Sequence, residues 1–125
     1  MVGMPEAAAQ LQDDYLFVDV CYLLANYHYE CRRYDESLEA CNDIDRTVER
    51  TQHYQRALAY SGEQRALIML EQMHIRDAHR EIAAAAAVAE SFADARQIAR
   101  IELAQAKRWY LTMRLRKARR VAQRL

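Results

Sequence analysis

Residues 24–44 read LANYHYECRRYDESLEACNDI. Two arginines in the middle of this segment separate two stretches that each have helical periodicity. Small residues recur on both sides, Ala25 before the arginines and Ser37 after them, among bulky residues such as Tyr34. Two helices approach within about 8–10 Å only where small side chains meet. The segment therefore predicts a helical hairpin that turns at Arg32.

The same pattern returns twice along the chain. YDESLEAC (34–41) aligns with IRDAHREI (75–82) and with LRKARRVA (115–122), so that the first two copies are 41 residues apart and the last two 40. The small positions coincide as Ala25, Ala66 and Ala106 in the first helix of each copy, and as Ser37, Ala78 and Ala118 in the second. A single hairpin cannot bury its apolar face, so repeated hairpins must stack.

This repeat predicts an all-α fold, a right-handed α-solenoid of three antiparallel helix hairpins. We expect a flexible N-terminus over 1–10 and one domain over 11–125, with repeats at about 18–51, 59–91 and 99–125. The expected helices are Gln12–Tyr29, Asp35–Glu49, His53–Gln72, Arg76–Ala89, Ala93–Thr112 and Arg114–Arg124. Thr51 and Ser91 are the expected N-caps of the third and fifth helices. The alanine run in REIAAAAAVAES (80–91) fits a helix against which neighbouring helices pack on two sides.

Composition supports a helical domain. The chain has 125 residues, of which 52% are hydrophobic and 29% charged, with only two glycines and one proline to make turns. The acidic N-terminus has no basic and apolar signal segment, and no apolar run reaches the ~18 residues of a membrane span. We therefore expect a cytoplasmic protein without a membrane partner. Sixteen arginines against two lysines suggest a bacterial source.

Charge is unevenly distributed, although the formal net charge is zero. Residues 1–50 carry eleven acids and four bases, whereas residues 91–125 carry two acids and ten bases. Such a dipole can steer partners or bring two copies together head to tail. A nucleic-acid contact through the basic end is the alternative, but no aromatic interleaving or reader motif accompanies it. We expect a solvated basic face there and no nucleic-acid partner.

Three cysteines and a histidine form the one candidate metal cluster: Cys21, Cys31, Cys41 and His28. Zinc ligands usually come in pairs two to four residues apart, whereas these cysteines are ten apart. We expect Cys21 and Cys41 to be buried thiols and Cys31 to be the accessible one. Phosphate loops, nucleophile elbows and H-E-x-x-H motifs do not occur. The expectation is a protein that is not an enzyme and has no catalytic residues, metal or cofactor.

The segment from Leu24 to Ile44 resembles a tetratricopeptide repeat, in the order of its small, bulky and aromatic positions. The second and third copies keep the two small positions but have Arg65 and Gln105 where the first has Leu24. None of the three has the usual turn glycine, in whose place Arg32, Met73 and Met113 stand, and none has the terminal proline. A period near 40 is similar to long-period variants in bacterial regulators, where such repeats accompany LuxR-type DNA-binding or diguanylate cyclase domains. The resemblance implies a protein–protein interaction module, regulatory or scaffolding in role.

In this family the first helices of the hairpins line a concave groove that binds a peptide or helix. The register of the resemblance places ten groove residues here: Tyr22, Asn26, Tyr29, Tyr60, Glu63, Leu67, Arg100, Leu103, Lys107 and Tyr110. Asp19 and Leu70 lie in the same register. The tyrosines would be the anchors. The family's carboxylate clamp has a lysine where Tyr22 stands, although Asn26 matches one clamp position, so a C-terminal carboxylate ligand is not expected.

Two questions stay open at this level. A chaperone of the secretion type would hold a client segment in the same groove, so the resemblance alone does not separate it from a regulatory domain. Solenoids normally end in a polar capping helix, and Val121 and Leu125 would leave an apolar stripe uncovered. Either the natural chain continues or a second copy covers the end, as in a homodimer.

Overall fold

The structure of the protein is a computed structural model that describes the backbone of residues 4–124 and the side chains of residues 10 and 12–124. Within this part the backbone forms five α-helices and no strand. The helices are α1 (Met4–Glu30), α2 (Tyr34–Thr51), α3 (Ala57–Glu71), α4 (Ile75–Ser91) and α5 (Ala95–Arg124). The predicted all-α class is thereby confirmed.

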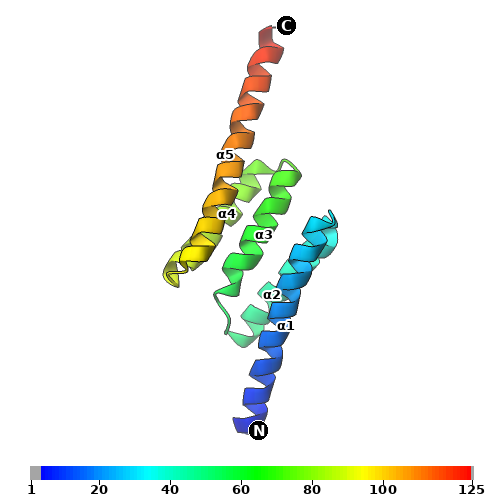
Figure 1. Cartoon of the computed structure of the whole chain (residues 1–125), viewed down its shortest axis with the longest axis vertical. Coiled ribbons are helices and arrows are strands. Elements are labelled where there is room, and N and C mark those ends of the chain that lie inside the picture. The colour runs from blue at the N-terminus through cyan, green and yellow to red at the C-terminus, as the bar shows by residue number, and fades with distance from the viewer. Residues whose placement is uncertain (1–3, 125) are drawn as a thin grey trace.

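The helices form two layers (Figure 1). Helices α1, α3 and α5 make the front layer of the view, and α2 and α4 lie behind them. Each helix packs on the next one along the chain, and α3 also contacts both α1 and α5. The N-terminal part of α1 and the C-terminal part of α5 extend past this body at opposite ends of the molecule. The front layer therefore presents three helices side by side on one face.

Three of the four connections use the same tight turn. Arg32, Met73 and Ala93 each have a positive φ, of 60°, 61° and 51°. The residue after each of them donates its backbone N–H to a carbonyl five residues back, as from Arg33 to His28 at 2.7 Å. This is the bonding of a Schellman motif, which usually has glycine at the left-handed position. Arg32 and Met73 occupy the first two turn positions that the repeat predicted.

Small residues bring the helices of each hairpin together, as predicted for the first two repeats. Ala25, Ala66, Ser37 and Ala78 are all buried, and the Ser37 hydroxyl donates to the Ala25 carbonyl at 2.7 Å. This bond satisfies a buried hydroxyl between α1 and α2, where Ala25 packs with Ala40 and Cys41. Two larger apolar clusters form the rest of the core, one of Val18, Cys21, Ile44, Val48 and Ala57, the other, between α3, α4 and α5, of Ala59, Ala66, Ile82, Ala85, Ala89, Ile101 and Ala104.

The third predicted hairpin is absent, because α5 continues without a break through the expected turn at Met113. Ala106 and Ala118, the small residues of that hairpin, are exposed, as is Val121. The segment has no glycine or proline and consists mostly of strong helix formers, so nothing local ends the helix. The chain therefore forms two hairpins and one long helix; Leu125 lies outside the described residues.

Two smaller expectations also differ. Thr51 ends α2, and Ser91 ends α4, so neither is the N-cap of a following helix. Asp94 takes that role for α5, because its Oδ1 accepts the backbone N–H of Gln97 at 3.1 Å. Helix α1 begins at Met4, eight residues before the predicted start, and residues 1–3 of the predicted N-terminal segment lie outside the described residues.

None of the helices in the described part combines the length and the apolar character needed to cross a bilayer.

Candidate functional site

The front layer contains a hollow of about 590 Å³. Its walls come from α1, from Ile44 of α2, from the segment that joins α2 to α3, from α3, and from Asp94 and the start of α5. Its lining residues are Tyr15, Val18, Asp19, Tyr22, Ile44, Tyr54, Arg56, Ala57, Tyr60, Asp94, Arg96, Gln97 and Arg100. Four tyrosines and three arginines are thus gathered where three helices meet. A hollow of this size accommodates a few side chains of a bound partner.

Tyr22, Tyr60, Glu63 and Arg100 form one connected group beside the hollow. The rings of Tyr22 and Tyr60 lie 5.2 Å apart and tilted, which links α1 to α3. The Arg100 guanidinium on α5 donates to the Tyr22 hydroxyl at 2.6 Å and to the Glu63 carboxylate at 3.2 Å. Glu63 is buried, and Gln97 donates to its second oxygen at 2.9 Å. Tyr22 on α1, Tyr60 on α3 and Arg100 on α5 are therefore held in place by contacts with one another.

Asp94 holds the lower wall of the hollow together. Its carboxylate caps α5 and also accepts from Arg56 at 2.9 Å and from the Tyr60 hydroxyl at 3.2 Å. The backbone N–H of Gln97, and then the Arg56 guanidinium, keep the pKa of Asp94 below its ordinary value. Burial, and then the nearby Asp94 charge, raise the pKa of the Tyr60 phenol, so that Tyr60 stays a hydrogen-bond donor at neutral pH.

A second group lies at the other end of the same face. Glu71 at the end of α3 accepts from the Tyr29 hydroxyl of α1 at 3.4 Å and from the Lys107 ammonium of α5 at 2.5 Å. The hydrogen bond from Lys107 is the main reason that the pKa of Glu71 is lowered. This ion pair is partly exposed, so its role is to orient side chains rather than to add much stability.

Of the ten predicted groove residues, Tyr22, Tyr60 and Arg100 line the hollow, and four others belong neither to its lining nor to the two groups above. Asn26 is half-buried on α1, and Leu67 packs against the cluster between α3, α4 and α5. Leu103 and Tyr110 are exposed on α5. The structure thus brings together Tyr22, Tyr60, Glu63 and Arg100, links Tyr29 with Lys107 through Glu71, and leaves these four apart.

Sequence reasoning missed part of the site. Arg56 and Asp94 lie just before the first residues of α3 and α5, and Arg96 and Gln97 lie in the first turn of α5. One signal could have found two of them: Arg56 and Arg96 precede the predicted Tyr60 and Arg100 by four residues, which is one helical turn on the same face. Asp94 carried a separate signal, since an aspartate before a helical segment is a preferred N-cap.

Two charged side chains at the hollow remain available. Asp19 on α1 and Arg96 on α5 form no hydrogen bond or ion pair with another described residue, and both side chains are exposed. Within the part of the chain that the structure describes, the hollow therefore has aromatic walls with one free negative charge on the α1 side and one free positive charge on the α5 side.

Two of the three cysteines lie in the interior of the protein. Cys21 and Cys41 are buried and Cys31 is exposed, as predicted. Burial raises the pKa of the Cys41 thiol to about 12 and also raises that of Cys21. Among the side chains that the structure describes, no three His, Cys, Asp or Glu residues are grouped so as to hold a metal ion.

Comparisons with models of known protein families, with curated proteins and with solved structures each found no match to this chain. The resemblance to tetratricopeptide repeats therefore stays a prediction from residues 24–44 and their recurrence.

Proposed function

We propose that the protein is a tetratricopeptide-like interaction module that binds a peptide or an amphipathic helix in the hollow of its front face. The observation that carries this proposal is the gathering of four tyrosines and three arginines, from three helices and the connection between α2 and α3, around one hollow of about 590 Å³. Tyrosine and arginine are enriched among the residues that dominate binding energy. Tyrosine offers a large contact area at low cost in entropy, and arginine offers several hydrogen-bond donors in a planar group.

The contacts beneath the hollow support a preformed site. Tyr22, Tyr60 and Arg100 hold one another through a ring contact and a hydrogen bond, so a ligand would not need to order them. Less ordering on binding leaves more of the contact energy as affinity. Such a site suits a ligand with one or two apolar side chains for the tyrosine walls.

The two free charges favour a particular ligand pattern. Arg96 would pair with a carboxylate of the ligand, and Asp19 would pair with a cationic side chain on the opposite side of the hollow. The expected ligand is therefore a short segment with an apolar centre between an acidic and a basic residue. A role in regulation or scaffolding in the cytoplasm is the context that fits such a module.

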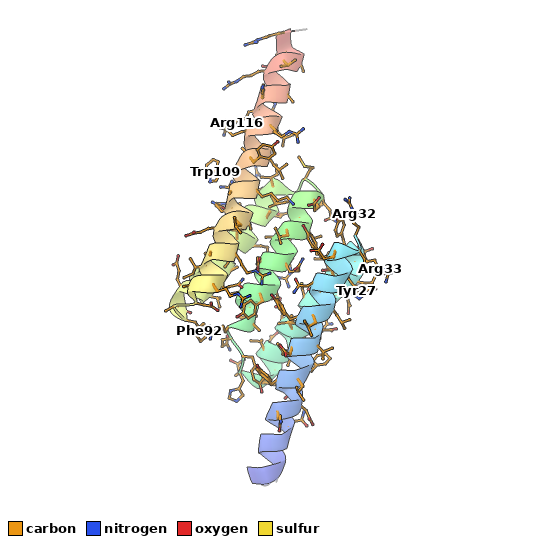
Figure 2. The ribbon with its side chains drawn as sticks, in the orientation of Figure 1. Tyr27, Arg32, Arg33, Phe92, Trp109 and Arg116 are labelled. Carbon is orange, nitrogen blue, oxygen red and sulfur yellow. The ribbon has the colours of Figure 1, made fainter. Side chains whose placement is uncertain are left out.

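The test is a selection from a displayed library of random peptides, followed by affinity measurements on the selected sequences. We expect Tyr60→Ala and Arg100→Ala each to weaken binding at least about tenfold, the size of effect seen at anchor residues. Phe92→Ala is the control, because Phe92 is an exposed aromatic residue at the turn from α4 to α5 (Figure 2). Peptides that bind Tyr60→Ala and Arg100→Ala as tightly as the wild-type protein would contradict the proposal.

A further inference from the structure

Helix α1 carries an exposed apolar stripe that we call the α1 outer face: Leu16, Val20, Leu23 and Tyr27. The spacing of four, three and four residues places the stripe along one side of the helix, opposite the buried Val18, Cys21 and Ala25. These four side chains are between 51% and 63% exposed. A helix that is apolar all round is normally covered on both sides. Tyr27 marks the outer face in Figure 2.

The repeat shows what normally covers this face. Forty-one residues later, the equivalent positions on α3 are Ala57, Ser61, Gln64 and Ile68, and all are at most 7% exposed. Forty residues further, Gln97, Ile101 and Ala104 on α5 are at most 4% exposed. On α3 this face packs on the preceding hairpin, where Ala57 joins Val18 and Ile44. On α1 the same face lacks a neighbour among the described residues.

At the other end of the row of helices α1, α3 and α5, one side of α5 is also exposed. On α3 the side toward the next helices consists of Ala59, Glu63, Ala66 and Leu70, which are buried. The equivalent residues on α5, which we call the α5 outer face, are Ala99, Leu103, Ala106 and Tyr110. All four are exposed, Leu103 by 72% and Tyr110 by 61%. Large contiguous apolar surfaces of this kind mark interaction sites.

The two open faces have opposite charge. Residues 1–31, which include the α1 outer face, contain five acids and neither lysine nor arginine, and residues 99–125, which include the α5 outer face, contain nine bases and one acid, Glu102. Asp13 and Glu30 flank the α1 outer face, and Lys117 and Arg120 continue the α5 outer face toward its C-terminal end. Charges arranged in this way attract the unlike faces of two copies and repel the like faces.

We propose that copies of this chain associate head to tail, with the α1 outer face of one copy packed on the α5 outer face of the next. The contact continues between molecules the stacking that α1, α3 and α5 show within one molecule (Figure 1). It is heterologous, so one copy of a pair keeps its α5 outer face free and the other keeps its α1 outer face free, and further copies can add at both ends. This contact is separate from the hollow and does not depend on what the hollow binds.

The first test measures the mass of the full chain by sedimentation equilibrium over a range of protein and salt concentrations. We expect a mass that rises with protein concentration beyond that of a dimer and falls as salt is added. Leu23→Asp and Leu103→Asp should each weaken the association at least about tenfold, because each places a charge in the apolar contact. Phe92→Asp is the matched control and should leave the mass unchanged. Helical circular dichroism confirms that the variants fold.

The second test identifies the two faces by charge reversal. One variant carries Asp13→Arg and Glu30→Arg, and the other carries Lys117→Glu and Arg120→Glu. Each variant alone should associate more weakly than the wild type, because the reversed charges reduce the attraction between its α1 and α5 segments. A mixture of the two should associate again, because the unaltered acidic α1 segment of one variant can contact the unaltered basic α5 segment of the other.

Three results would overturn the proposal. If the wild-type chain is monomeric at every concentration and at low salt, the two open faces do not bind each other. Loss of association in only one of the two charge variants would indicate a contact between like faces. Failure of the mixture to associate, with both variants folded, would exclude the pairing of α1 with α5.

Discussion

The guanidinium of Arg65 on α3 lies 2.5 Å from the carboxylate of Asp45 on α2. Its other nitrogen lies 3.2 Å from Glu81 on α4, so one side chain joins three helices. Arg65 is only 15% exposed, and Ser61 also donates to Asp45. This explains why the second repeat has an arginine where the first has Leu24: the position on α3 lies between two rear helices, and each supplies a carboxylate.

Arg65→Met should lower the free energy of unfolding by about 1–2 kcal/mol. The loss is smaller than the 3–5 kcal/mol of a fully buried pair, since Asp45 and Glu81 are partly exposed and can be hydrated. Arg46→Met is the control, because Arg46 pairs with Glu39 and Asp43 on the exposed side of α2. That change should cost at most about 0.5 kcal/mol. Urea unfolding measures the free energy of unfolding of both variants. Equal losses in the two would contradict the role of Arg65 in joining three helices.

The left-handed turn residues should be sites of stabilising substitution. Met73 and Ala93 have φ values of 61° and 51°, which cost a residue other than glycine about 1–2 kcal/mol. Met73→Gly and Ala93→Gly should therefore raise the free energy of unfolding by a net ~1 kcal/mol each, after the added entropy of the unfolded chain is subtracted. The melting temperature should rise accordingly. Ala84→Gly, an exposed position inside α4, is the control and should lower stability by about 1 kcal/mol. A lower melting temperature for both turn variants would show that these turns are not strained.

The turns also show how far the sequence alone could lead. The 41-residue repeat correctly placed turns at Arg32 and Met73, but it also placed one at Met113, where α5 continues. None of the three positions has glycine or proline, so the local sequence does not distinguish a turn from a helix there. What distinguishes them is packing, since the first two hairpins close on a small residue in each helix and the third does not.

The sequence likewise predicted only part of the candidate site. Tyr22, Tyr60 and Arg100 could be predicted because they follow the repeat along the inner faces of three helices. Arg56 and Asp94 were missed because they lie in the connections, where the repeat has no register. Their contact with each other spans 38 residues and follows from the stacking of α5 beside α3, which no local pattern encodes.

Gly62 on α3 lies close to Ala85 on α4. A Cβ atom at this position would lie 3.1 Å from the Cβ of Ala85, which is tighter than ordinary packing. Gly62→Ala should be close to neutral, because its gain in helix propensity of about 1 kcal/mol offsets the crowding. Gly62→Val should lower stability by about 1–3 kcal/mol, since its extra methyl groups force the helices apart. Chemical denaturation measures both; equal stability of the two variants would contradict a close contact.

The three thiols should react at very different rates. Cys31 is exposed at the start of the first hairpin's turn, whereas Cys21 and Cys41 are buried. The pKa of Cys41 is raised to about 12 by burial, so almost none of it is thiolate at neutral pH. One thiol equivalent should react with a disulfide reagent in the native protein and three after unfolding. Cys31→Ser should abolish the native reaction; a second fast equivalent in that variant would mean that the first hairpin opens readily.

Asp94 should make stability depend on acid pH in a way that one substitution isolates. Its pKa lies below the ordinary 3.8, mainly through the backbone N–H of Gln97 and then through Arg56. A lowered pKa in the folded state adds stability that is fully present above the unfolded pKa and is lost as pH falls through the folded pKa. Asp94→Asn keeps a good N-cap but removes the charge. The stability difference between wild type and Asp94→Asn should therefore be constant above about pH 5 and shrink as pH falls below 3.8. Asp94→Ala, which also loses the cap, should remain less stable than Asp94→Asn across the whole range. Thermal unfolding at several pH values makes the comparison, and a difference between wild type and Asp94→Asn that does not change with pH would show that the carboxylate charge contributes nothing.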